Sequence, residues 1–333
     1  MLFRRAQALF HPEQYHGWGK TRQYFEGWYY KVVNAAEDKT YAFIVGIAME
    51  TPGVQQAFVQ VLDGKALTAT YHKFPAAAFQ PATGKFEIRL ANNRFSANTI
   101  QLDLPEIKGR LAFSQQVTWP NAWYSPGIMG PFSFVPFMEC YHGILSMDHA
   151  IQGSLLINDE SVDFSGGRGY MEKDWGQSFP SGYIWMQSNH FSQPGISVKA
   201  SVANIPWLGS SFVGFIAGVW LHDRLIQFTT YNFTRLRKVW ADLDKVEIVL
   251  ENRHYRLELF VSRSGTAQLA SPILGFMKGR IEESMTAQIE ATLRDKRSKR
   301  ILLQDKGRNA GLEVAGNVAE LFVPRLIPKQ SAG

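Results

Sequence analysis

The chain has 333 residues, a net charge of +6, 13% aromatic residues and a single cysteine. This length fits one large or two ordinary domains, and a chain of this size buries enough surface to fold without covalent crosslinks. Cys140 alone excludes an internal disulfide and is typical of a reducing compartment. The basic residues are scattered among acidic ones without a recognition motif, so we predict no nucleic-acid partner.

The beginning of the sequence carries two arginines, but Pro12 and Glu13 arrive before an apolar stretch long enough for a secretory signal. The longest apolar run, residues 212–221, has about half of the roughly 20 residues that a membrane-spanning helix needs. We therefore expect a cytoplasmic protein. Positive charge beside many aromatic residues also leaves open a peripheral contact with an anionic membrane surface.

Short runs of β-branched and aromatic residues predict strands through most of the chain. In chain order, they lie at residues 41–47, 57–62, 85–90, 95–104, 246–261 and 285–293. Asn92 and Asn252 mark predicted hairpin turns. Residues 285–293 alternate between apolar or small and polar side chains, which is typical of a strand with one solvent-exposed face. Residues 278–283 allow a short helix.

Three stretches of the sequence recur in the same order. Residues 24–29 are echoed by residues 170–175, and residues 125–130 by residues 271–277, with the same offset in both cases. A third pair, residues 85–90 and 245–250, is slightly further apart. The period is too long for a solenoid. It predicts two similar β domains, residues 1–165 and 166–333, whose equivalent elements line one shared site.

Residues 119–138 and the shorter segment 272–277 interrupt the strand pattern. Four prolines in the longer segment prevent a regular central strand, yet its aromatic residues make it too apolar for a solvated linker. Two interpretations stay open: lids over the mouths of apolar cavities, or loops that cover hydrophobic edges of the β domains.

The first candidate acid lies among aromatic residues near the start of the chain. On a strand, Glu26 shares a face with Tyr24, Trp28 and Tyr30. A carboxyl group desolvated by such neighbours has a raised pKa and remains a proton donor near neutral pH. The alternative is that Glu26 pairs with a neighbouring basic residue such as Lys31.

The second candidate is a pair of acids in the glycine-rich stretch 166–176. If this stretch is extended, Glu172 and Asp174 share a face, and their mutual repulsion raises one of the two pKa values. One acid could then donate a proton while the other stays ionised. The alternative is that Arg168 and Lys173 neutralise both acids in a structural network.

The third candidate is His142, within residues 139–149. His142, Ser146 and Asp148 share strand parity, whereas His149 points to the opposite face. The sharp nucleophile turn of a hydrolase is missing from this stretch, and the opposed histidines argue against a metal, so no metal site is predicted. His142 is either a group that orients or relays a proton or a structural histidine.

Taken together, these motifs resemble the tocopherol cyclase family. The similar stretches are FEGWYYK at 25–31, WYSP at 123–126 running into GPF at 130–132, YHGILS at 141–146, and GYMEKDWG at 169–176 with Phe179 and Pro180. The resemblance spans residues 11–316 and is of a bacterial type, because the plastid-targeting extension of the plant members does not precede it. It implies an all-β fold, a tandem of two lipocalin-like antiparallel barrels or sandwiches.

The resemblance also implies a reaction. A prenylated hydroquinol is protonated at the first double bond of its tail, and the phenol oxygen captures the cation to close a chromanol ring. This isomerisation needs a buried acid, a dry pocket and aromatic walls, but no metal or nicotinamide cofactor.

Asp174 or Glu172 is the predicted acid, with Glu26 as the other choice, and His142 assists in proton return. The residues predicted to contact the isoprenoid or quinol are Trp28, Tyr29, Trp175, Trp185, Tyr124 and Asp148. Two alternatives remain: a non-catalytic protein that binds an isoprenoid or other lipid, and an enzyme that hydrates an isoprenoid double bond.

Overall fold

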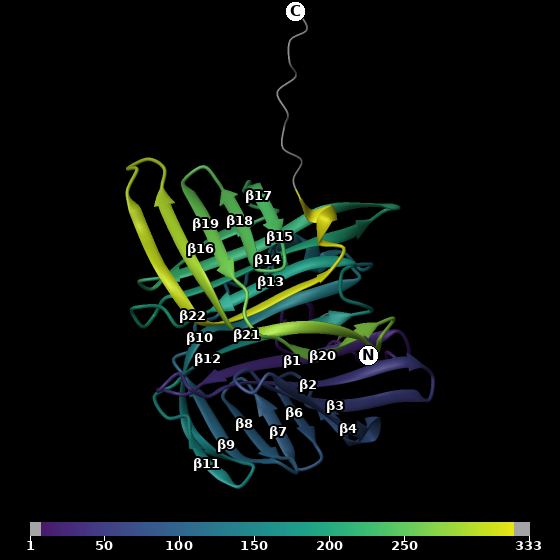
Figure 1. Cartoon of the computed structure of the whole chain (residues 1–333). Helices are drawn as coiled ribbons and strands as arrows, with labels where there is room; N and C mark the ends of the chain where they lie inside the picture. Colours follow the sequence, from purple (N-terminus) through teal and green to yellow (C-terminus); the bar gives the residue numbers. More distant parts are fainter. Residues whose placement is uncertain (1–7, 323–333) are drawn as a thin grey trace, which may run out of the picture.

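The computed structural model describes residues 8–322, which fold almost entirely into strands arranged in two halves (Figure 1). Residues 1–6, part of the stretch examined for a secretory signal, lie outside the described residues, as do the outer ends of the two predicted domains. Within residues 8–322, no helix is long and apolar enough to cross a membrane.

The first sheet contains twelve antiparallel strands and forms the purple-to-teal half of Figure 1. Its order is β4 (Thr68–Pro75), β3 (Val54–Asp63), β2 (Thr40–Thr51), β1 (Tyr24–Val33), β12 (Arg168–Gly176), β10 (Cys140–Ile157), β9 (Ile107–Ser114), β8 (Thr99–Asp103), β7 (Asn93–Ser96), β6 (Glu87–Leu90) and β5 (Phe79–Pro81), and β11 (Glu160–Asp163) pairs with β10.

The second sheet contains ten antiparallel strands and forms the green-to-yellow half. Its order is β16 (Arg224–Thr229), β15 (Ser210–Leu221), β14 (Ser197–Trp207), β13 (Gly182–Ser188), β22 (Ile301–Gly316), β21 (Phe276–Asp295), β19 (Tyr255–Ser262), β18 (Lys245–Glu251) and β17 (Arg235–Ala241), and β20 (Ala267–Ile273) pairs with β21. Short 3-10 helices lie at Ala76–Ala78, Gly130–Phe134 and Val318–Leu321. The predicted all-β fold is confirmed.

Most of the predicted strands and turns are present. The predicted strand at 95–104 is instead two strands, β7 and β8, because the Ser96 hydroxyl accepts hydrogen bonds from the backbone amides of Asn98 and Thr99 and closes a turn between them. The short helix considered at 278–283 is wrong. These residues lie in β21, whose backbone pairs with β20 from Ala267 opposite Glu283 onward.

The two sheets share one strand order. The series β4-β3-β2-β1-β12-β10 in the first sheet corresponds to β16-β15-β14-β13-β22-β21 in the second. The echoed sequences, however, do not occupy equivalent places: residues 24–29 lie in β1 and residues 170–175 in β12, and these strands pair with each other, Tyr29 opposite Glu172. The predicted equivalence of these segments is therefore wrong, although the topology is duplicated.

The chain passes from one sheet to the other later than the predicted division at residues 165 and 166. Strand β12 runs back into the middle of the first sheet, between β1 and β10. The crossing therefore falls between Gly176, the last residue of β12, and Gly182, the first residue of β13.

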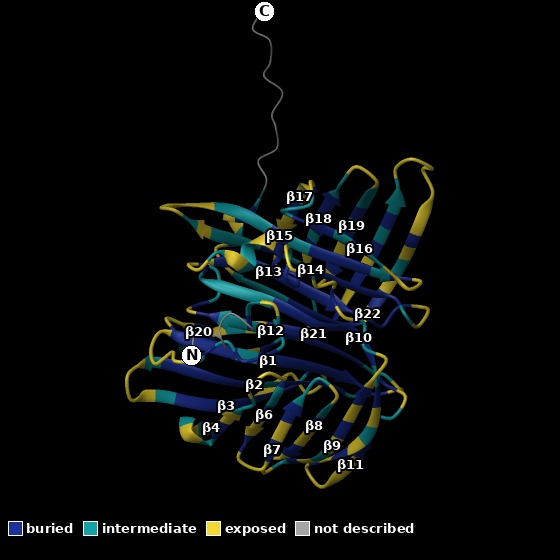
Figure 2. Ribbon diagram, turned by 180° about the vertical axis from the view of Figure 1, so that it is seen from behind, coloured by how far each residue is buried: buried dark blue, intermediate teal, exposed yellow. Residues whose placement is uncertain are grey.

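Three hydrophobic clusters stabilise the structure. Alternate residues of β1 divide between them: Trp28 and Tyr30 pack inside the first sheet, whereas Tyr29 belongs to a cluster between the two sheets. On β13, Ile184 packs inside the second sheet and Trp185 joins the same cluster between the sheets. Figure 2 shows the buried residues concentrated along the strands where the halves meet.

A buried ion pair ties the N-terminal segment to the first sheet. The Nζ of Lys173 lies 2.6 Å from a carboxylate oxygen of Glu26, and both side chains are 0% exposed. Lys173 also donates hydrogen bonds to the carbonyls of Pro12 and Gln14, and Glu26 accepts hydrogen bonds from the backbone amides of His16 and Gly17. The pair therefore satisfies the backbone of a segment without regular structure.

This environment is the opposite of the one predicted for a Glu26 acid. Burial alone would raise the pKa of Glu26, but Lys173 and His16 outweigh burial and lower it. Glu26 does share a face with Tyr24 and Trp28, as predicted, yet the face points into the first sheet's own core. Glu26 is an ionised structural carboxylate here.

Removing the cation from this pair should strongly destabilise the fold. We expect Lys173→Met to lower the free energy of unfolding by about 3–5 kcal/mol, because Glu26 would be left charged in an apolar interior. Urea denaturation at neutral pH measures this loss. The matched control is Lys85→Met, since Lys85 pairs with Glu87 at 2.5 Å but is 64% exposed. It should cost less than about 1 kcal/mol. Equal losses in the two variants would contradict the role of the buried pair.

Candidate active site

A largely apolar cavity lies between the two sheets. Strands β1, β2, β3, β10 and β12 line it from the first sheet, and β13, β14, β15, β20, β21 and β22 from the second. Its walls carry aromatic side chains, among them Phe25, Phe58, Phe132, Phe179, Phe212 and Phe215. The cavity lies between the two sheets, where residues of both could line a shared site. The interior of each sheet is filled by its own hydrophobic core.

Both irregular segments reach this cavity. Met129, Phe132 and Met138 of the 119–138 segment line it, and so does Pro272 of the shorter segment. Phe132 packs against Phe212 of β15, with ring centroids 5.9 Å apart. Residues of both segments thus line the one cavity between the sheets. The lid interpretation expected the segments to cover the mouths of separate cavities.

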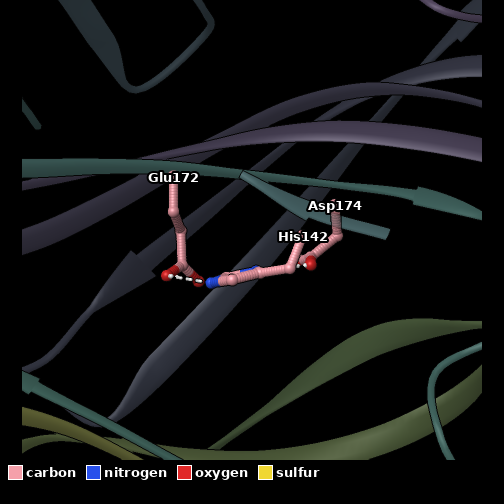
Figure 3. A group of neighbouring side chains, drawn as sticks. All are labelled: His142, Glu172 and Asp174. Atoms are coloured by element: carbon pink, nitrogen blue, oxygen red, sulfur yellow. Dashed lines mark hydrogen bonds and ion pairs between the residues drawn. The ribbon is translucent and has the colours of Figure 1, made fainter. Parts of the chain in front are cut away.

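Three polar side chains form a row on the cavity wall (Figure 3). His142 of β10 lies directly opposite Asp174 of β12 in the sheet, and its Nδ1 is 2.8 Å from Asp174 Oδ1. On the other side, His142 Nε2 is 3.5 Å from Glu172 Oε2. The imidazole therefore lies between two carboxyl groups and is hydrogen-bonded to that of Asp174, whereas within residues 8–322 its Nε2 has no hydrogen-bond partner.

Glu172 is the more enclosed of the two carboxyl groups. It accepts hydrogen bonds from Tyr170 Oη at 2.5 Å and from Trp185 Nε1 at 2.9 Å, the second across the boundary between the sheets. Burial raises the pKa of Glu172 and Asp174 adds to the rise, although His142 and Lys199 oppose it. The predicted repulsion between the two acids is present, but burial is the larger cause.

A second group of acids that the sequence analysis missed lies on the other sheet. Glu283 of β21 is 1% exposed and accepts a hydrogen bond from Tyr29 Oη at 2.5 Å. Burial raises its pKa to about 8, against the opposing effects of Tyr29 and Lys31. Within residues 8–322 its second oxygen, Oε2, has no hydrogen-bond partner. Burial also lowers the pKa of Lys31 to about 7. Burial therefore favours the uncharged forms of both Glu283 and Lys31.

The second acid of this group is Glu313 of β22, which lines the cavity. Tyr183 of β13 donates a hydrogen bond of 2.6 Å to its Oε2. Glu283 could have been found from the sequence, because it continues the apolar face of the alternating residues 285–293. Glu313 had no such signal.

The structure brings together half of the predicted site residues. Those that line the cavity are His142, Glu172, Asp174, Tyr29 and Trp185. Glu26, Trp28 and Trp175 lie on the opposite face of the first sheet, where the indoles of the two tryptophans are 4.6 and 4.5 Å from Lys173 Nζ.

The last two predicted residues lie away from the cavity lining. Asp148 is buried and forms an ion pair with Arg168 while accepting a hydrogen bond from Asn189. Tyr124 is 63% exposed, and its ring contacts Trp123. Neither position supports a direct contact with a molecule in the cavity.

The row could also hold a metal ion. His142, Glu172 and Asp174 each offer a ligand atom, and these atoms lie within 4.8 Å of one another. One imidazole and two carboxylates are ligands that divalent transition metals accept. Proton relay and metal binding are thus two chemistries that this geometry supports.

Comparison with known proteins places the chain in a family and a fold. A model of the tocopherol cyclase-like family matches residues 110–316. The structure of CghA is similar with a TM-score of 0.57 and 9% identity, over 89% of each chain. A putative AttH from Nitrosomonas europaea has a TM-score of 0.52 and 13% identity, over 89% of this chain and 93% of the other. At these identities the structures show the fold alone, and they confirm the predicted lipocalin-like architecture. The curated proteins include no significant match.

The raised pKa of Glu283 predicts a pH-dependent stability. Between its ordinary value and about 8, the folded protein keeps a proton that the unfolded chain has released. Stability is therefore lost as pH rises through this window. Glutamine does not titrate, so Glu283→Gln should be more stable than the native protein, by a margin that widens from about pH 5 to about pH 8.

Urea denaturation at several pH values measures this margin. The matched control is Glu290→Gln on the same strand, whose side chain is 63% exposed and so meets solvent in both states. Its effect on stability should be small, because substitutions of exposed side chains away from the core change the free energy of unfolding little. A constant margin for Glu283→Gln would show that burial does not hold a proton on this carboxyl group.

Proposed function

Because the chain belongs to the tocopherol cyclase-like family, we propose that it is an enzyme that closes a chromanol ring on a prenylated hydroquinol. The observation that carries this proposal is the row of Asp174, His142 and Glu172 on the wall of an otherwise largely apolar cavity. A cavity of this kind combines an acid with surroundings that protect a cation from water.

The walls fit an isoprenoid tail and a short-lived positive charge. Aromatic rings from both sheets, including Phe25, Phe179 and Phe215, face the cavity. A cation beside such a ring gains about 2 kcal/mol or more when water is excluded. The aromatic walls therefore lower the barrier to forming a tertiary carbocation.

Asp174 is the acid of the proposed reaction. Its side chain is 24% exposed, against 7% for Glu172, and it lines the cavity, so a bound molecule can reach it. His142 contacts one of its oxygens, Oδ1, and leaves Oδ2 for the proton that is transferred.

The proposed reaction conserves all atoms. The π electrons of the first double bond in the tail form a C–H bond with the proton of Asp174, and the charge remains on the tertiary carbon. A lone pair of the neighbouring phenol oxygen then forms the C–O bond of the new ring. The phenol proton then passes through His142, whose Nδ1 contacts Asp174 Oδ1, to the carboxylate that released the first proton. The product is an isomer of the substrate.

The apolar walls also favour a second function, a non-catalytic carrier of an isoprenoid or other lipid. Hydration of an isoprenoid double bond would begin with the same proton transfer and end with capture of the cation by water. The three outcomes differ in mass or in chromatographic retention: ring closure gives an isomer of unchanged mass but altered retention, hydration adds the mass of one water, and a carrier returns its ligand unchanged.

Replacing the acid should stop the reaction without disturbing the fold. We expect Asp174→Asn to reduce ring closure of a geranyl hydroquinol by at least about a hundredfold, because the amide cannot donate a proton of comparable acidity. Chromatography with mass spectrometry measures the product, and urea denaturation checks that the variant folds. The matched control is Asp163→Asn on β11, an exposed strand residue far from the cavity lining, which should leave ring closure unchanged.

Two results would contradict the proton relay. Unchanged ring closure in Asp174→Asn would remove Asp174 from the role of acid. Activity that is lost on dialysis against a chelator and restored by a divalent cation would instead make the row of His142, Glu172 and Asp174 a metal site.

A further inference from the structure

The cavity contains one pair of polar side chains that the proposed reaction does not use. Tyr183 of β13 and Glu313 of β22 both line the cavity, and the tyrosine hydroxyl donates a hydrogen bond of 2.6 Å to Glu313 Oε2. They belong to the second sheet, whereas His142, Glu172 and Asp174 belong to the first. A molecule bound between the sheets therefore meets polar groups from two sides.

Both members of this pair are held in their neutral forms. Burial raises the pKa of Glu313 well above its ordinary value, and the nearby charges of Glu283, Glu172 and Asp174 raise it further. Burial likewise raises the pKa of Tyr183 well above its ordinary value, and Glu313 adds to this. In these forms the pair offers a carboxylic acid and a phenol, one hydrogen-bond donor beside several acceptor positions.

The chemistry of such a pair selects its ligand. A neutral donor and acceptor fit a neutral hydroxyl group, whereas a carboxylate or phosphate ligand would lose its hydration where no lysine or arginine is among the described residues that line the cavity. A protonated Glu313 cannot take the proton from the phenol that attacks the cation. It fits instead a hydroxyl that keeps its proton through the reaction.

We propose that Glu313, oriented by Tyr183, binds the ring hydroxyl of a hydroquinol that remains free in the chromanol product. This inference rests on the proposed function and names the feature of the substrate that the second sheet recognises. With the ring held there, the prenyl tail is directed toward Asp174 on the first sheet. Glu313 is thus a residue that determines specificity for a hydroxylated ring over a bare isoprenoid.

Paired ligands test this assignment. The probes are 2-geranylhydroquinone and its 4-O-methyl ether, which lacks only the hydroxyl that does not enter the new ring. Binding is measured by titration calorimetry in an Asp174→Asn background, so that no turnover intervenes. We expect the free hydroxyl to bind about tenfold more tightly than the ether, because the ether leaves buried polar groups unpaired.

Two variants should abolish this preference and one should keep it. Glu313→Leu and Tyr183→Phe should bring the ratio of the two dissociation constants close to one. Glu313→Gln keeps a neutral donor and acceptor of the same size, so it should retain the preference and exclude a simple loss of bulk. If Glu313→Leu fails to fold, Tyr183→Phe, which removes one oxygen, still decides the outcome.

An unchanged ratio in Tyr183→Phe and Glu313→Leu would overturn the assignment, as would equal binding of the two probes by the Asp174→Asn protein. A different observation would contradict the proposed function: the native protein would form no ring-closed product. A carrier that recognised the hydroxyl would show the binding preference without the product, so the two failures are distinguishable.

Discussion

The structure depends on the two-residue alternation of the paired strands β1, β12 and β10. One face of this ribbon carries Glu26 and Lys173, whose ion pair is sealed inside the first sheet. The other face carries Asp174, Glu172 and His142, which meet the cavity. Neighbouring residues of β12 thus have opposite roles, since Lys173 stabilises the fold and the acids on either side of it face a ligand site. A shift of one residue in the pairing would exchange the two faces and lose both functions.

Burying acids between the sheets opposes folding, and the surrounding contacts offset this. Glu283, Glu313 and Glu172 all have pKa values raised by burial, so each is easier to bury with its proton than without it. Glu283, Glu313 and Glu172 accept hydrogen bonds from Tyr29, Tyr183 and Trp185 respectively, although Glu283 Oε2 has no partner within residues 8–322. The cluster of apolar residues between the sheets surrounds these acids. Departures from ordinary burial rules concentrate at functional sites, and this cavity fits that pattern.

The sequence predicted individual strands better than it predicted which strands pair with each other. Runs of β-branched and aromatic residues located several strands, and strand parity correctly placed Glu172 and Asp174 on one face, because these patterns are local. It could not show that β1 pairs with β12, or which face of that ribbon meets the second sheet. For this reason Trp28 and Trp175 were assigned to the ligand, although their rings pack on Lys173 in the opposite direction. Glu313 had no local signal, since its importance arises only from a neighbour on another strand, Tyr183.

The duplicated topology explains why the cavity lies between the modules. Each sheet fills its interior with a core, so only the faces turned toward each other can leave room for a ligand. The equivalent strands β13 and β1 each donate across this boundary: Trp185 of β13 donates a hydrogen bond to Glu172 of β12, and Tyr29 of β1 donates one to Glu283 of β21, although β12 and β21 are not equivalent strands. Each sheet thus provides one side chain that donates a hydrogen bond to a carboxyl group of the other sheet. In an isolated sheet Glu283 would lose the hydrogen bond from Tyr29, and Glu172 would keep only the one from Tyr170, so both sheets contribute to holding the acids.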